Sequence, residues 1–400
     1  MKLNKLKNRG PIIVNATNIG ERMSGIGVYS LNLLKAMATM NTDIQFIVYL
    51  NKNAKKHFTE FYFPSNFQIR WVSRWLSPDY GFYGHLNRLL FANYLSFKHK
   101  RMLVFNTSQL VVNFFRRNQI ITIHDVIPLL FKQFHKKQYP YFKYLLKYAL
   151  RYANKIITPS QHTKQLLQEI YHIPGEKIQV IHNGVPQSEE AYPETIPFTQ
   201  PYILYVGRVC PMKNISRLIQ AFLKLQNHIP HRLVIVGEGL NYIRKEVKAG
   251  RLPEDVLQNK RIVFKGHVEN KDMRGLYQHA DLFVFPSLYE GFGLPPMEAM
   301  AYGCPVLVSS AASLPEVCGS AASYIEPENI NHLAEGMLKL LKNPTFRNKL
   351  VNKGYARVKQ YSWHYSAKEH LKILEAQLHS PQATSPKEET KPSVLTNSLK

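Results

Sequence analysis

Short apolar runs alternate with longer segments of helical periodicity along most of this chain. In the first half, these runs predict strands at 12–15, 44–50, 120–123, 155–158 and 178–181 and a helix at about 28–40. In the second half, they predict strands at 202–206, 233–236, 262–264, 282–285 and 306–309 and a helix at 215–225. Strands that alternate with helices are typical of βαβ units, so the pattern predicts an α/β fold with parallel sheets.

Polar and proline-containing stretches divide this pattern into parts. Residues 186–201 contain four prolines and no periodicity, which indicates an interdomain linker. We expect residues 1–190 to form one Rossmann-like domain and residues 200–360 a second, with a ligand cleft between them. Residues 380–400 are polar and lack an apolar face, which is typical of a disordered tail.

The composition fits a globular chain with an unusual charge. At 400 residues the chain is too long for one core, since domains average about 150 residues. Its 52 basic and 27 acidic side chains leave a net charge of +25. Residues 1–190 hold half of the basic side chains but only a third of the acidic ones. This surplus favours anionic partners, which include nucleic acid, lipid headgroups and phosphorylated substrates.

The chain lacks the features of secreted and membrane-spanning proteins. Its three cysteines, Cys210, Cys304 and Cys318, form no Cys-x-x-Cys pair, so we expect reduced thiols in a cytosolic protein. The apolar run Pro11–Val14 is too short for a signal peptide. No run approaches the roughly 18 apolar residues that are needed to span a bilayer.

The segment EGFGLPPME, from Glu290 to Glu298, follows a predicted strand and opens a helix. Free N–H groups at a helix N-terminus favour an anion such as phosphate, and nearby carboxylates can accept hydrogen bonds from sugar hydroxyls. Alternatively, Glu298 only favours the first helical turn and Glu290 is a solvated loop charge. The Gly-Phe-Gly turn directly after a buried strand favours a binding site.

Two basic residues, Arg208 and Lys213, follow the first strand of the second domain. Ligands of parallel sheets bind beyond the carboxyl ends of the strands. There, an arginine fork and a lysine point charge can hold a diphosphate. In so basic a chain both can also be ordinary exposed cations, but their position favours the diphosphate.

Together these motifs resemble those of the retaining family 4 glycosyltransferases over residues 11–379. In the second domain, the resembling segments are Gly207–Asn214, Val236–Gly239, Phe264–Val268, Ala280–Leu282 and Glu290–Glu298. In the first domain, they are Gly25–Tyr29, His124–Pro128, Thr158–Ser160 and Ile181–Val185. The His-Asp-x-Ile-Pro form is similar to the mannosyltransferase-like subgroup of bacterial surface-polysaccharide assembly. The resemblance implies a GT-B fold, in which two Rossmann-like domains face each other and a closing helix at 361–379 packs back on the first.

The resemblance also implies roles in donor binding. Arg208 and Lys213 would hold the donor diphosphate and stabilise it as it leaves. Glu290 would contact the donor sugar, and Glu298 the ribose hydroxyls. Val268 would pack against the nucleotide base. The sugar and phosphates would contact the backbone amides of Gly291, Phe292, Gly293 and Leu294. A glycine loop of the first domain, with Gly25 and Gly27, would let the backbone approach the phosphates.

His124 and Asp125 end a predicted strand at the expected cleft. The resemblance places His124 beside the donor sugar and makes both residues catalytic candidates, with Glu290, Arg208 and Lys213. Taken alone, a histidine after an apolar strand is more often a structural residue. The family retains the anomeric configuration by front-face attack without a protein nucleophile, so stabilisation of the leaving diphosphate would be the main catalytic effect.

A basic and aromatic segment lies in the first domain. Lys143, Lys147 and Arg151 share one helical face and are interleaved with aromatic residues: Tyr141, Phe142, Tyr144 and Tyr148. This pattern suits an interfacial helix on an anionic membrane. A solvated helix with its aromatic side chains in the core fits equally well. Nucleic-acid binding is a further alternative, although no nucleic-acid-binding module is present.

We therefore expect a metal-independent, retaining hexosyltransferase. Its donor would be a nucleotide sugar, with GDP-mannose as the expected donor and a UDP-hexose as the alternative. No cofactor besides the donor is expected. No metal site is expected, because the chain has no Asp-x-Asp and His228-x-x-His231 lacks a third ligand. The acceptor would be a growing, lipid-linked surface glycan, with the enzyme in the cytoplasm or on the inner face of the plasma membrane. A non-catalytic nucleic-acid-binding protein on the same fold is the remaining alternative.

Overall fold

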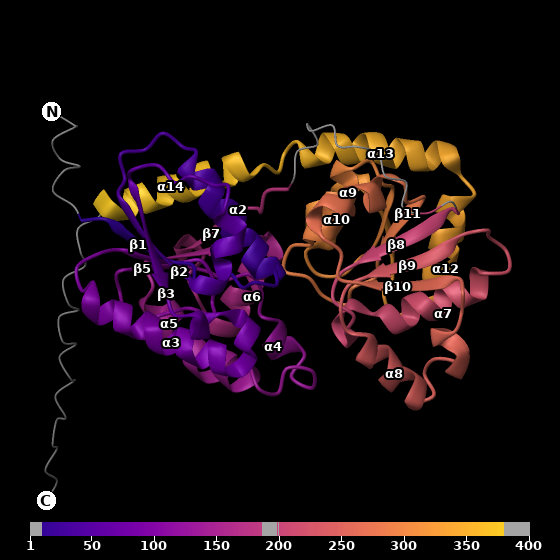
Figure 1. The fold of residues 1–400 in the computed structure, drawn as a ribbon, viewed down its shortest axis with the longest axis horizontal. Helices are drawn as coiled ribbons and strands as arrows, with labels where there is room; N and C mark the ends of the chain where they lie inside the picture. Colours follow the sequence, from indigo (N-terminus) through magenta and orange to yellow (C-terminus); the bar gives the residue numbers. More distant parts are fainter. Residues whose placement is uncertain (1–9, 186–197, 199, 380–400) are drawn as a thin grey trace, which may run out of the picture.

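Two α/β domains lie side by side in the computed structural model, which describes residues 10–185, 198 and 200–379 (Figure 1). The first domain is drawn in indigo to magenta, and the second in pink to orange. The chain returns from the second domain to the first, where the last helix, in yellow, lies. The expected tail at 380–400 and most of the expected linker at 186–201 lie outside the described residues.

The first sheet has seven parallel strands in the order β3-β2-β1-β4-β5-β6-β7. The strands are β1 (Ile12–Asn15), β2 (Phe46–Asn51), β3 (Phe67–Val72), β4 (Val104–Asn106), β5 (Gln119–Thr122), β6 (Lys155–Thr158) and β7 (Ile178–Val180). The sequence pattern did not predict β3 or β4. At the edge of the sheet, β3 alternates apolar with exposed polar residues, and β4 is only three residues long.

The second sheet has six parallel strands in the order β10-β9-β8-β11-β12-β13. The strands are β8 (Tyr202–Val206), β9 (Arg232–Val236), β10 (Ile262–Gly266), β11 (Leu282–Phe285), β12 (Val306–Ser309) and β13 (Ser323–Ile325). Of these, only the three-residue β13 escaped prediction. The strand order reverses beside β8, where β11 pairs with it, and ligands of such sheets bind at this point beyond the carboxyl ends.

Helices cover both faces of each sheet. In the first domain they are α2 (Gly25–Ala38), α3 (Gly81–Lys98), α4 (Ile127–Leu130), α5 (Leu146–Tyr152) and α6 (Gln161–Tyr171). In the second they are α7 (Ile215–Leu225), α8 (Leu240–Lys248), α9 (Asn270–Gln278), α10 (Leu294–Ala301), α11 (Leu314–Cys318), α12 (Ile330–Leu341) and α13 (Pro344–Val358). Within the described ranges, no helix combines the length and the apolar character that crossing a bilayer requires.

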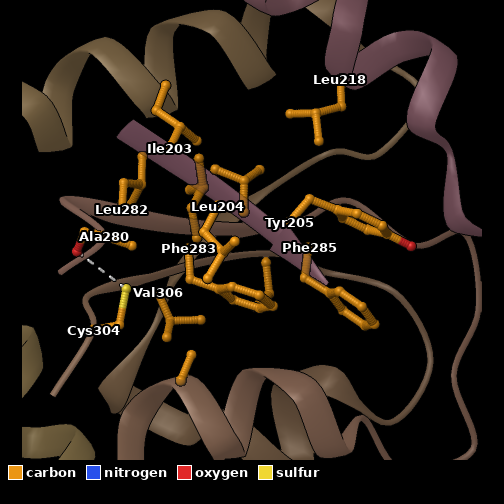
Figure 2. Close-up of a cluster of buried hydrophobic side chains, with 14 of the residues drawn as sticks. Ile203, Leu204, Tyr205, Leu218, Ala280, Leu282, Phe283, Phe285, Cys304 and Val306 are labelled. Atoms are coloured by element: carbon orange, nitrogen blue, oxygen red, sulfur yellow. Dashed lines mark hydrogen bonds between the residues drawn. The ribbon is translucent and has the colours of Figure 1, made fainter. Parts of the chain in front are cut away.

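The core of the second domain lies between its central strands and the helices above and below them (Figure 2). Ile203 and Leu204 on β8 are fully buried, as is Phe283 on β11. The rings of Tyr205 and Phe285 stack with centroids 6.0 Å apart near the carboxyl ends of these two strands. The site residues that follow both strands are therefore anchored on a tightly packed base.

The last helix, α14 (Trp363–His379), completes the first domain rather than the second. It packs with α2 on one face of the first sheet, where Leu374 and Leu33 belong to the same core cluster. The hydroxyl of Tyr29 on α2 lies 2.8 Å from Nε2 of His370. Burial lowers the pKa of His370 to about 4, so its imidazole is neutral at physiological pH.

Candidate active site between the two domains

Three charged side chains that follow three different strands come together where the domains meet. Lys213 follows β8, and Glu290 follows β11 in the same domain. Nζ of Lys213 donates a hydrogen bond to Oε1 of Glu290 and lies 5.4 Å from the ring centroid of Phe285. Asp125 follows β5 in the first domain, and its carboxyl is within electrostatic reach of both. The structure thus brings together three of the five catalytic candidates.

Burial is the main cause that raises the pKa of the Asp125 carboxyl. The negative charge of Glu290 raises this pKa further, while the amide of Ile127 and the Lys213 ammonium act in the opposite direction. Arg208, the remaining basic candidate, is exposed, and within the described ranges its guanidinium forms no hydrogen bond or ion pair. Its side chain is therefore available to an anionic ligand.

The loop from Gly291 to Leu294 presents an unusual set of backbone groups. Its carbonyls are held by serines: Ser160 of the first domain donates to the Gly291 carbonyl at 2.8 Å, and Ser313 donates to the Phe292 carbonyl at 3.1 Å. The amides of Gly291, Phe292, Gly293 and Leu294 donate to no protein acceptor in the described part of the chain. Because they precede and open α10, these free N–H groups form a favourable site for an anion.

Glycine is required at two positions of this loop. Gly293 has a φ of +100°, which residues with a Cβ rarely adopt. A Cβ on Gly291 would lie 2.1 Å from the carbonyl oxygen of His124 in the first domain. The donor-side loop thus lies in direct backbone contact with the strand end that carries His124 and Asp125.

His124 is buried and held in one orientation. Its backbone N–H donates to Oε1 of Gln109 at 3.1 Å, and its Nε2 lies 3.0 Å from the Thr107 carbonyl. Its ring meets the Tyr29 ring edge-on, with centroids 4.5 Å apart. Burial lowers the pKa of His124 to about 4, so the imidazole is neutral. With its proton on Nε2, facing a carbonyl, Nδ1 remains free to accept a hydrogen bond from a sugar hydroxyl.

The other donor-binding candidates lie on other elements. Glu298, on α10, accepts a 2.9 Å hydrogen bond from the Tyr277 hydroxyl, and burial raises its pKa. Val268 follows β10 and packs partly buried against the core. Gly25 and Gly27 were expected in a loop but lie in the first turn of α2. No protein atom lies within 4 Å of a Cβ built on Gly25, so the fold itself does not require glycine there.

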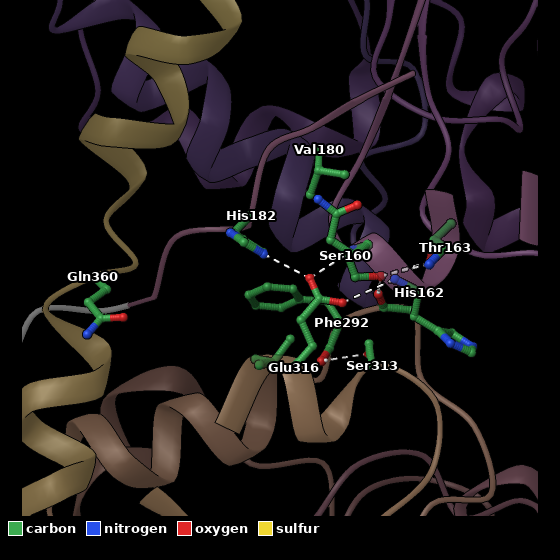
Figure 3. A network of polar contacts seen from close by, with 12 residues as sticks. Ser160, His162, Thr163, Val180, His182, Phe292, Ser313, Glu316 and Gln360 are labelled. Atoms are coloured by element: carbon green, nitrogen blue, oxygen red, sulfur yellow. Dashed lines mark hydrogen bonds and ion pairs between the residues drawn. The ribbon is translucent and has the colours of Figure 1, made fainter. Parts of the chain in front are cut away.

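Sequence reasoning missed the carboxylate that joins the two domains, Glu316 on α11 (Figure 3). It accepts hydrogen bonds from the amides of Gln161 at 2.8 Å and His162 at 3.1 Å, in the first turn of α6. Nε2 of His182 also contacts it at 3.0 Å. Burial raises the pKa of Glu316, but these hydrogen bonds outweigh it and hold the pKa below its usual range. The partners are more than 130 residues away in the chain, so no local pattern could reveal them.

Replacing Glu316 with alanine should lower the free energy of unfolding by about 1–3 kcal/mol, because two amides at the start of α6 lose their acceptor. Thermal denaturation of the purified protein measures this loss. Glu328→Ala is the matched control, since Glu328 is exposed and only weakly paired with Arg217 at 3.7 Å. Equal melting temperatures for the two variants would contradict the proposed link between the domains.

Comparison with known proteins identifies the family of this chain. The model of the family "Glycosyltransferase Family 4" matches residues 23–189, and that of "Glycosyl transferases group 1" matches residues 187–357. O-antigen chain mannosyltransferase B of Escherichia coli is 30% identical over 256 residues, which are 61% of this chain and 66% of that protein. O-antigen chain mannosyltransferase RfbU of Salmonella typhimurium is 28% identical over 80% of this chain and 87% of its own length.

Solved structures show the same fold at low sequence identity. The Anabaena protein HepE, solved with UDP-glucose, matches 92% of this chain and 99% of its own with a TM-score of 0.70 at 16% identity. A glycosyltransferase from Rickettsia africae matches 94% of this chain and 100% of its own, with a TM-score of 0.67 at 19% identity. Two family models that succeed each other along the chain, one for each α/β domain, show that this protein belongs to the family 4 glycosyltransferases and has their GT-B fold.

Proposed function

We propose that this protein transfers a hexose, with retention of configuration, from a nucleotide sugar to a growing surface glycan. The main support is the pairing of Lys213 with Glu290 beside the free amides of the Gly291–Leu294 loop. An ammonium and a row of N–H groups suit a diphosphate, and a carboxylate beside them suits a sugar hydroxyl.

In this proposal the side chains bind and orient the substrates and form no covalent intermediate. The bond between the sugar and the diphosphate breaks while an acceptor hydroxyl attacks the same face. The leaving diphosphate takes the proton of that hydroxyl, so charge and atoms balance. Lys213, Arg208 and the free amides stabilise the charge that develops on the diphosphate, without a bound metal ion. The imidazole of His124, which is neutral, holds the sugar together with Glu290. Glu298 holds the ribose.

We propose GDP-mannose as the donor, because several similar proteins are mannosyltransferases of O-antigen chains. A UDP-hexose is the alternative, favoured by the likeness to a structure solved with UDP-glucose. The proposed acceptor is lipid-linked, which would place the enzyme in the cytoplasm or on the inner face of the plasma membrane. The first domain, which has few acidic residues and so most of the charge surplus, is the side on which a phosphorylated acceptor would bind.

A thermal-shift panel with GDP, UDP and ADP tests the proposal. We expect GDP to raise the melting temperature by several degrees at about 100 times its Kd, where binding adds about 2.7 kcal/mol to the stability. A response to UDP alone would replace GDP-mannose with a UDP-hexose. No response to any nucleotide would overturn the proposed transferase and favour the nucleic-acid-binding alternative.

A further inference from the structure

Helix α3 is apolar on both of its sides. One side is buried in the first domain, through apolar residues such as Leu89, Ala92 and Leu95. The opposite side carries five large apolar residues at spacings of three and four, which are between 45% and 75% exposed: Tyr83, Leu86, Leu90, Tyr94 and Phe97. The solvent-facing side of a helix is ordinarily polar, so an exposed apolar surface of this kind indicates an interaction site. We call these five residues the α3 stripe.

A second exposed apolar group begins beside α3, where the amide of Phe114 donates to Oδ1 of Asn93 at 3.4 Å. It consists of Phe115, before β5, and of Tyr144, Leu145 and Tyr148, around the start of α5. The rings of Phe115 and Tyr148 are 5.9 Å apart. Leu89 of α3 and Leu146 of α5 share one core cluster, which places both helices on the same side of the sheet, as Figure 1 shows.

Basic side chains border both groups. Nζ of Lys98 lies 6.0 Å from the Tyr94 ring and Nζ of Lys100 lies 5.9 Å from the Phe97 ring. Beside the second group, Lys143 and Lys147 lie 5.1 Å from the rings of Tyr144 and Tyr148. Between Asp79 and Glu169 the chain has a single acidic residue, Asp125, which belongs to the site between the domains. The charged side chains that these contacts place beside the two apolar groups are therefore all cationic.

We propose that this face, the α3 stripe with the neighbouring start of α5, docks on an anionic phospholipid bilayer. Aromatic and leucine side chains insert at the level of the headgroups, and the lysines beside them pair with lipid phosphates. A second copy of the chain would bring two cationic borders together, which opposes self-association. Nucleic acid would leave Leu86 and Leu90 exposed, since neither offers a stacking plane or a polar group. The inference does not depend on the sugar or nucleotide that the site accepts.

Co-sedimentation with vesicles tests the docking face. We expect the full-length protein to bind vesicles of phosphatidylcholine with about 30% phosphatidylglycerol about 10-fold more tightly than pure phosphatidylcholine, with binding that weakens as salt rises. The triple variant L86Q/L90Q/F97Q keeps every charge and should lose at least about 10-fold in binding. Tyr365→Gln, which removes an exposed aromatic ring on α14, is the matched control.

A second variant and a second ligand keep the result unambiguous. K143Q/K147Q keeps the apolar residues and should lose the preference for anionic vesicles. The nucleotide-induced thermal shift should persist in both variants, which shows that they are folded and separates this test from that of the proposed function. Unchanged vesicle binding by the triple variant would overturn the proposal. So would binding to a single-stranded oligonucleotide in the absence of vesicle binding, which would assign the surface to nucleic acid.

Discussion

Lys213→Ala should lower the turnover of nucleotide sugar by about 10²–10³-fold, because the leaving diphosphate loses a positioned cation in a partly buried site. The ammonium is held by Glu290 and by the ring of Phe285, so the free protein already fixes the cation to which we assign the diphosphate. Initial rates with saturating donor and acceptor measure the loss. Lys224→Ala is the matched control, since this exposed lysine of α7 donates a hydrogen bond to Asn331 and lies outside the candidate active site.

The same substitution leaves Glu290 without its cation, so stability must be followed together with turnover. Thermal denaturation of Lys213→Ala should show a modest loss, and the double variant K213A/E290Q should recover it. Turnover should stay low in the double variant. Recovered activity there, or near-normal activity in Lys213→Ala, would show that Lys213 only neutralises Glu290 and does not hold the diphosphate.

Gly291→Ala should lower turnover by about 10²-fold through geometry alone. A Cβ at this position would meet the His124 carbonyl oxygen at 2.1 Å, so the two backbone segments, which belong to different domains, would have to move apart. The second domain keeps its own fold, so nucleotide binding, followed by thermal shift, should remain close to that of the wild type. A loss in kcat without a loss in nucleotide affinity is therefore the expected signature.

Gly10→Ala is the matched control for this experiment. A Cβ on Gly10 would approach the Met102 side chain no closer than 3.6 Å, an ordinary contact. If Gly291→Ala turned over at the wild-type rate, the close approach of the two domains at His124 would have no part in the reaction.

The sequence was most informative where the structure depends on local pattern. Continuous apolar runs such as 202–206 became central strands, and the GT-B fold that the motifs implied is confirmed by structures of the same architecture. Lys213 and Glu290 could be named because each lies in the segment after a strand that was easy to recognise. The edge strand β3 was missed because its exposed polar positions interrupt the apolar run.

The remaining features depend on tertiary contacts that no local pattern records. The sequence of segment 139–152 fitted a core-packed helix and a membrane-facing helix equally well. The structure buries Tyr141 and Phe142 and exposes Tyr144 and Tyr148. The α3 stripe was not predicted, because a helix that is apolar on both sides gives no sign of which side faces the core. Only the packed structure shows which one is left uncovered.

The helix α14 has a consequence for how the protein is made. Tyr29 on α2 meets His370, a residue that the ribosome adds 341 positions later. Until then, the apolar groove that Leu374 fills beside Leu33 has no cover. During synthesis the second domain can close its own core first, while the first domain waits for the end of the chain. The domain that emerges first is therefore the last to be completed, and a nascent chain halted before residue 363 would present an open hydrophobic surface to chaperones and proteases.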